Sequence, residues 1–161
     1  MIEDINLYFL KRSFNIREKY NTKIVKKKKL LNDFDKLFFN FLNLIHYDLN
    51  ILYNRNEEKK IKYEISHKLE NVKFKRIIYI IENLCYEDDI CLYTLNCLSF
   101  FYKLNIIYSY DAFYYKMVYN ENSDIYYILN NDKDFFNIKK DKLDDFFKDK
   151  YEIKDIYKPI Y

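Results

Sequence analysis

The chain contains no glycine in its 161 residues, and this absence constrains the backbone more than any other feature. Glycine is the residue that most readily takes positive φ in tight turns and just past the ends of helices. Loops that hold phosphate groups against closely approaching backbone amides also depend on glycine. We therefore exclude glycine-rich phosphate-loop chemistry, and we expect asparagine to occupy the turns that glycine would normally occupy.

Length and composition predict one folded domain over residues 1–161. A domain of about 150 residues buries about 68–70% of the surface that its unfolded chain exposes. Half of the residues are hydrophobic and a fifth are aromatic, which is far more apolar than a disordered chain. The bias toward Lys, Asn, Ile, Tyr and Phe is typical of an AT-rich genome, such as that of a large DNA virus, a protozoan parasite or an endosymbiont.

The first residues and the cysteines predict an intracellular protein. Glu3 and Asp4 stand where a secretory signal would carry basic residues. Cys85, Cys91 and Cys97 are an odd number of thiols in an apolar segment, which is typical of buried free thiols in a reducing compartment. Polar residues interrupt the apolar stretches well before the roughly 18 residues that a membrane-spanning helix needs. We expect no membrane insertion, and a location in the host cytoplasm or the virion if the protein is viral.

Apolar residues at helical spacing predict that helices come first in the chain. One helix is expected over Ile2–Phe14, and four more over Phe34–Leu52, Glu57–Leu69, Val72–Cys85 and Cys91–Tyr102. The β-branched run Ile77–Ile81 could also form a strand. The helix from Phe34 has the widest apolar face, which predicts a central helix with Asp33 as its N-cap. The next helix has a narrow apolar face and is expected on the surface. Asp88 and Asp89 are expected to cap the last of the four.

The last third of the sequence is typical of a small sheet. Asn105–Tyr108 is a short β-rich run. Phe113–Tyr119 and Asp124–Leu129 flank Asn120–Ser123, a pattern that predicts a hairpin with a four-residue loop. A charged helix is expected around Leu143. Helices followed by strands predict an α+β fold, with an N-terminal helical half, a small antiparallel sheet and a C-terminal helix, and not a doubly wound fold.

A run of four lysines is a candidate basic contact patch, formed by Lys26, Lys27, Lys28 and Lys29. Such a run could contact phosphates, and the many aromatic residues could stack on bases. However, the net charge is only +3, and a charge run is more often a solvated face. Nucleic-acid binding is therefore kept as a minor alternative.

The sequence contains no complete metal or nucleophile motif. Successive cysteines are six residues apart, whereas zinc sites bring cysteines in pairs separated by two to four residues. His46 and His67 fall on separate predicted helices, and local sequence places neither near a nucleophile. The acids Glu87–Asp89 are explained as a helix cap. We therefore expect no metal and no cofactor.

Several motifs resemble an uncharacterised protein family of giant DNA viruses. They lie between residues 38 and 130: Phe38-Phe39-Asn40-Phe41, Leu95 with Phe100-Phe101, Asn105-Ile106-Ile107-Tyr108, and Tyr114-Tyr115. The order of segments is also similar to that of papain-like and ovarian-tumour-type thiol proteases, in which a central helix carries the nucleophile and a hairpin carries the histidine. In the viral family the first motif is aromatic-aromatic-cysteine-aromatic, and a histidine follows the last hairpin strand.

At these two positions the chain departs from the resemblance. Asn40 stands at the cysteine position, and Asn130 or Asn131 stands near the histidine position. Asparagine offers neither a thiolate to attack a carbonyl nor a basic nitrogen to accept a proton. The resemblance therefore implies a degenerate, non-catalytic member that acts through contacts with another protein. A structural protein of a virion or other assembly and a nucleic-acid-binding accessory protein are the alternatives, and the oligomeric state stays open.

Overall fold

The computed structural model describes residues 34–130 and 135–153, in which four helices precede the first strand, as the sequence predicts. The helices are α2 (Lys36–Leu44), α3 (Arg55–Lys68), α4 (Ile77–Tyr86), α5 (Leu92–Phe101) and α6 (Leu143–Phe147). The strands are β1 (Ile106–Tyr110), β2 (Phe113–Met117), β3 (Ile125–Leu129), β4 (Phe136–Lys139) and β5 (Tyr151–Ile153). The fold of this part is α+β. The predicted N-terminal helix, the Asp33 cap, Lys26–Lys29 and Asn131 lie outside the described residues.

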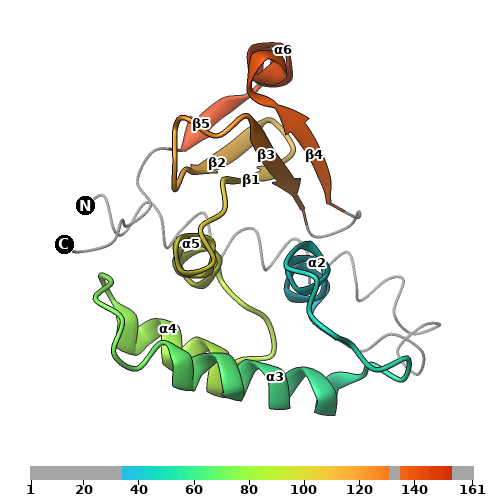
Figure 1. Cartoon of the computed structure of the whole chain (residues 1–161), viewed down its shortest axis with the longest axis vertical. Helices are drawn as coiled ribbons and strands as arrows, with labels where there is room; N and C mark the ends of the chain where they lie inside the picture. Colours follow the sequence, from blue (N-terminus) through green and yellow to red (C-terminus); the bar gives the residue numbers. More distant parts are fainter. Residues whose placement is uncertain (1–33, 131–134, 154–161) are drawn as a thin grey trace.

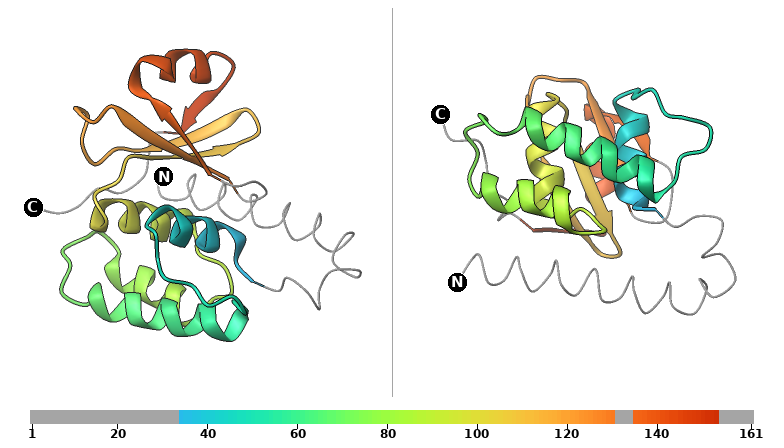
Figure 2. Two further views of the ribbon diagram at one scale, coloured as in Figure 1. Left: turned by 45° about the vertical axis from the view of Figure 1, so that its right-hand side comes forward. Right: turned by 90° about the horizontal axis from the view of Figure 1, so that it is seen from below.

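The elements are arranged in layers (Figure 1). The sheet has α6 on one face and the pair α2 and α5 on the other, while α3 and α4 lie side by side beyond that pair (Figures 1 and 2). The largest apolar core lies between the sheet and the four helices α2 to α5. A second, smaller core lies between the sheet and α6, around Ile107, Ile128 and Leu143. Alternate residues of β1 enter different cores, as the pleat of a strand requires.

The sheet is mixed, so the predicted antiparallel sheet is wrong in part. Its strand order is β4-β3-β1-β2-β5. The pairs β1–β2 and β3–β4 are antiparallel, whereas β1–β3 and β2–β5 are parallel. The predicted charged helix is α6, but β5 follows it and returns to the edge of the sheet, so α6 is not the last element.

The predicted hairpin between β2 and β3 is wrong, because β1 lies between these two strands. The connection crosses the end of β1, where the buried side chain of Asn105 holds it. Asn105 Oδ1 accepts the backbone N–H groups of Tyr119 and Asn120, and Nδ2 donates to the Asn120 carbonyl at 2.7 Å. Asn120 Oδ1 in turn accepts the N–H of Asn122 at 3.0 Å. Asparagine does shape this turn, but through side-chain amides and without positive φ.

The central helix is shorter than predicted, because α2 ends at Leu44. His46 follows with φ of 57°, in the left-handed region that usually takes glycine. The N–H of His46 donates to the Asn43 carbonyl and the N–H of Tyr47 to the Leu42 carbonyl, which is the Schellman pattern. Lys103 ends α5 in the same way, with φ of 61°. Among the described residues, positive φ falls on His46, Arg76, Lys103 and Asp111, and on no asparagine.

Helix starts also differ from the sequence predictions. Asp35 caps α2, because its side chain accepts the N–H of Phe38. Helix α5 begins after Cys91 with no side-chain cap, so Asp88 and Asp89 do not serve as the predicted caps. Helix α3 is capped by Asn54 through the N–H of Glu57. No helix within the described ranges is long and apolar enough to cross a membrane.

Candidate functional site

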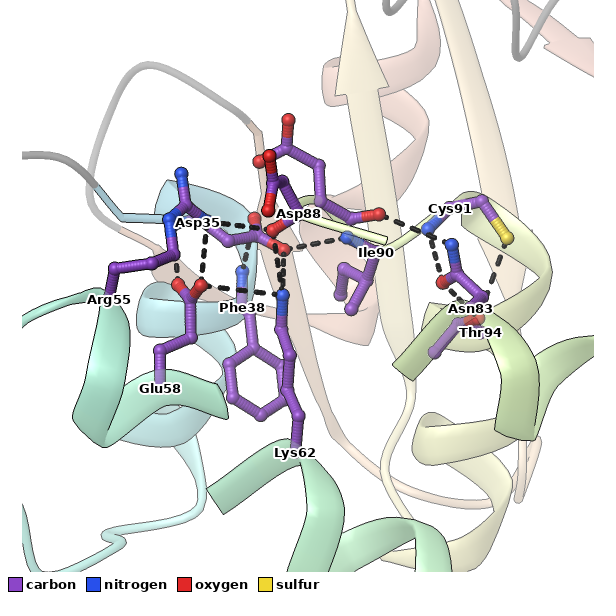
Figure 3. Close-up of polar contacts among 11 residues, drawn as sticks. Asp35, Phe38, Arg55, Glu58, Lys62, Asn83, Asp88, Ile90, Cys91 and Thr94 are labelled. Carbon is purple, nitrogen blue, oxygen red and sulfur yellow. Dashed lines mark hydrogen bonds and ion pairs between the residues drawn. The ribbon is translucent and has the colours of Figure 1, made fainter. Parts of the chain in front are cut away.

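The N-terminal end of α2 is fixed by the buried carboxylate of Asp35 (Figure 3). Its Oδ1 caps the helix by accepting the N–H of Phe38 at 3.2 Å. Its Oδ2 accepts the backbone N–H of Ile90 at 2.6 Å and a hydrogen bond from Lys62 Nζ at 3.1 Å. A single carboxylate thus joins α2, α3 and the segment that links α4 to α5.

The positive charge beside Asp35 is the side chain of Lys62, which is only 1% exposed. Besides Asp35, Lys62 Nζ donates to the Asp88 carbonyl at 2.9 Å and lies 3.5 Å from Glu58 Oε2. The ammonium also lies 5.1 Å from the centroid of the Phe38 ring. An ammonium has three donors, and here they face two carboxylates and a carbonyl. These neighbours compensate for the loss of water around a buried charge.

Glu58 is the second buried carboxylate of this cluster. Its Oε1 accepts the backbone N–H of Asp35, and its Oε2 accepts a hydrogen bond from Arg55 Nη1 at 2.6 Å. Arg55 Nη1 also donates to the Asp88 carbonyl at 2.7 Å. Burial raises the pKa of Glu58, while the charge of Lys62 opposes that rise. We call Asp35, Arg55, Glu58 and Lys62 the charged junction.

The segment between α4 and α5 is also held from its other side, by Asn83 (Figure 3). Asn83 Oδ1 accepts the N–H of Cys91 at 3.0 Å and the hydroxyl of Thr94 at 2.6 Å. Asn83 Nδ2 donates to the Asp89 carbonyl at 3.2 Å. Backbone groups of residues 88–91 are therefore bonded to α2 and α3 on one side and to α4 on the other.

The charged junction has the properties of an architectural cluster. Its two carboxylates and two cations balance in formal charge, and their polar atoms face one another and the backbone of residues 88–90. A general acid or base must reach the reacting atoms of a substrate. Asp35, Glu58 and Lys62 are buried, so they contact the fold and not a substrate. Removing one partner of such a cluster leaves an uncompensated charge in the interior.

The positions singled out by the resemblance lie together in the structure. Asn40 is buried in the middle of α2, and its Nδ2 donates to the backbone carbonyl of Asn130 at 3.4 Å. Asn130 directly follows β3, so this contact joins α2 to the end of that strand. The interaction is between an amide and a carbonyl and provides neither a nucleophile nor a base. Asn40 also lies past the first turn of α2, away from the helix N-terminus that favours a thiolate.

Burial disfavours the thiolate form of two of the three cysteines. Cys91 and Cys97 are buried as predicted, whereas Cys85 is only half-buried, and all three are free. Burial raises the pKa of Cys97 to about 12 and also raises the pKa of Cys91, which disfavours the thiolate in both. Cys91 Sγ lies 3.4 Å from Thr94 Oγ1, and Cys85 Sγ lies 3.4 Å from Ser66 Oγ.

Both histidines, His46 and His67, are exposed. His46 forms the end of α2 and does not lie within the helix as predicted. His67 lies in the last turn of α3, where its Nδ1 is 2.8 Å from Glu70 Oε1 and its ring contacts that of Tyr63. In the part of the chain that the structure describes, no group of three or more His, Cys, Asp or Glu side chains could hold a metal ion.

Sequence reasoning missed the charged junction. The narrow apolar face of α3 predicted a surface helix, yet Glu58 and Lys62 lie on its buried side together with Ile61 and Ile65. The signal available was their spacing, because positions 58 and 62 are one helical turn apart and adjoin the apolar stripe. Asp35 could not be paired with them from sequence, because the contact joins residues 27 positions apart.

Comparison with protein-family models, with curated proteins and with solved structures found no match to this chain.

Proposed function

We propose that this protein is non-catalytic and acts through contacts with other proteins, on a scaffold related in segment order to papain-like thiol proteases. The observation that carries the proposal is the part-buried contact between Asn40 and Asn130. The resemblance would put a cysteine and a histidine near these positions, where the chain has an amide bonded to a backbone carbonyl. Neither group can attack a carbonyl or accept a proton from a nucleophile.

Support for a contact function comes from the turn between α2 and α3. Ile51 and Leu52 are 99% and 78% exposed at its tip. Asn50 shapes the turn, because its Oδ1 accepts the N–H of Leu52 and its carbonyl accepts the N–H of Tyr53. The ring of Tyr53 then packs among neighbouring aromatic rings of the α2 region. A shaped turn that presents two adjacent aliphatic side chains to solvent suits insertion into an apolar pocket of a partner protein.

The proposal is tested by assaying the purified full chain for cleavage of ubiquitin conjugates and of unstructured peptides. We expect no turnover above that of a buffer blank. Cleavage that disappears when Cys85, Cys91 and Cys97 are all replaced by serine would overturn the proposal, because it would mean that another thiol had taken over as nucleophile. Circular dichroism of the triple variant would show that it remains folded.

A structural role in a virion or other large assembly is the second candidate. The observation that favours it is the exposure of several aromatic side chains, including Tyr63, Tyr86 and Tyr151, because aromatic residues supply much of the area of protein interfaces. Mass spectrometry of purified particles decides between the two. Abundant copies would favour the structural role, and absence from the particles would remove it.

A further inference from the structure

Helix α4 is apolar on its outer as well as its inner side. Ile80 and Leu84 are buried in the main core, whereas Ile78 and Tyr86 point outward and are 72% and 83% exposed. We call the exposed residues Ile78, Tyr79, Glu82 and Tyr86 the outer stripe of α4. A helix that is apolar on all sides is normally covered on all sides. Among the elements that the structure describes, α3 and α5 pack against α4; Tyr93 of α5 contacts the ring of Tyr79, whereas Ile78 and Tyr86 stay mostly exposed.

The charges at the two ends of α4 have the opposite order to the one that its own dipole favours. The exposed residues Lys73 and Lys75 precede the helix, and Glu87 and Asp88 follow it. A helix N-terminus is favourable for negative charge and its C-terminus for positive charge. An antiparallel helix of the same sequence would bring acidic residues to the basic end and basic residues to the acidic end. The charges that are unfavourable for an isolated α4 are therefore complementary to those of a second α4.

We propose that the outer stripe of α4 is a self-association surface, on which α4 of a second copy packs antiparallel about a two-fold axis near Glu82. In that register each Ile78 lies opposite Tyr86 of the other copy, since both are four residues from the axis. A two-fold interface requires a self-complementary patch. The outer stripe meets this requirement in its apolar contacts and in the charges at its ends. Glu82 lies opposite itself, and this repulsion limits the affinity.

The contact is small, because a helix of 10 residues is about 15 Å long. Interfaces below about 1,200 Å² are typical of weak and transient association. We therefore expect a reversible dimer in the micromolar range or weaker. The inference is independent of the proposed function, because it uses α4 and neither Asn40 nor the turn at Ile51. Failure of one leaves the other intact.

Sedimentation equilibrium of the full chain tests the inference, over roughly 10 µM to 1 mM to cover weak association. We expect a monomer–dimer equilibrium, and we expect Ile78→Glu to raise its Kd by at least about 100-fold, because a two-fold interface contains each residue twice. Ile125→Glu is the control, since it places the same charge at an exposed aliphatic residue of β3, away from α4. It should leave the Kd unchanged. A wild-type chain that stays monomeric up to the highest concentration would overturn the inference.

Charge exchange separates the antiparallel pairing from other contacts. One variant carries Lys73→Glu and Lys75→Glu, and the other carries Glu87→Lys and Asp88→Lys. Each variant alone should dimerise at least about tenfold more weakly than the wild type, because like charges then meet at both ends. An equimolar mixture should recover the wild-type affinity, since acidic ends then meet basic ends. Two results would overturn the inference: both variants dimerise weakly and their mixture also stays monomeric, or the dimer is insensitive to Ile78→Glu. Either result would place the contact elsewhere or on a different partner protein.

Discussion

The first turn and the middle of α2 bury polar groups in two different ways. At the first turn, Asp35 belongs to a cluster of opposite charges that joins α2, α3 and the segment before α5. One turn further on, Asn40 makes a neutral contact of 3.4 Å with the carbonyl of Asn130. The charges of this region therefore lie where elements are joined, and the position that the resemblance assigns to a nucleophile is uncharged.

This difference indicates how a chain without glycine can keep a defined arrangement. Paired charges in a protein interior are compatible with few arrangements, because any other arrangement leaves a charge without a partner. The neutral contact of Asn40 imposes a weaker requirement. Removing a charge from the charged junction should therefore lower the free energy of unfolding more than removing the side-chain amide of Asn40.

The largest effect is expected for Lys62→Met, which keeps the length of the side chain and removes its charge. Asp35 and Glu58 would then share the interior without the lysine, so the free energy of unfolding should fall by about 3–5 kcal/mol. Urea denaturation monitored by circular dichroism measures the free energy of unfolding. Lys59→Met, at an exposed position of the same helix, is the control and should change it by less than about 0.5 kcal/mol.

A second substitution tests whether uncompensated carboxylates cause the loss of stability in Lys62→Met. If the cost of Lys62→Met comes from uncompensated carboxylates, then adding Glu58→Gln should restore part of the lost stability. A loss of less than about 1 kcal/mol for Lys62→Met, which is ordinary for a point substitution, would mean that the charged junction does not hold these elements together.

A smaller effect is expected for Asn40→Ala. The variant removes the neutral hydrogen bond to the Asn130 carbonyl, so the free energy of unfolding should fall by about 1–2 kcal/mol in the same urea experiment. A loss as large as that of Lys62→Met would contradict the distinction between the first turn and the middle of α2.

A substitution at the C-terminal end of α2 should raise the stability of the protein. His46 holds positive φ at an exposed position, which a residue with a Cβ adopts at a cost. His46→Gly should therefore stabilise the protein by about 0.5–1 kcal/mol, after allowance for the greater freedom of glycine in the unfolded chain. A rise in Tm in differential scanning calorimetry checks this. Lys59→Gly, within α3, should instead lower the Tm, because glycine is unfavourable inside a helix.

Much of the described fold could be predicted from spacing alone. The apolar periodicity located α3, α4 and α5 to within a few residues, and the β-rich run at Asn105 located β1. The end of α2 could not be predicted, because His46 and Tyr47 continue a helical pattern and only the backbone turns there. The strand order could not be predicted either. It places β1 between β2 and β3, and the connection that crosses the end of β1 is bonded to the Asn105 side chain from 14 and 15 residues later in the chain.

Only part of the contacts described around α2 had a signal in the sequence. The resemblance singled out Asn40 and Asn130, and the structure places the two residues in contact. The charged junction gave only a local signal, because Glu58 and Lys62 are close in sequence whereas their partners Asp35 and Asp88 are not. Contacts between distant segments are set by packing, and no periodicity in one segment encodes them.

The proposal of a non-catalytic protein is tested most directly by iodoacetamide labelling of the folded chain between pH 7 and pH 9, read by mass spectrometry. Cys97, with its pKa raised to about 12, and buried Cys91 should stay unlabelled across this range, because the thiolate is the reactive form. Half-buried Cys85 should react more slowly than in the chain unfolded in urea. Labelling of any of the three that is faster in the folded chain than in the unfolded chain would reveal an activated nucleophile and contradict the account.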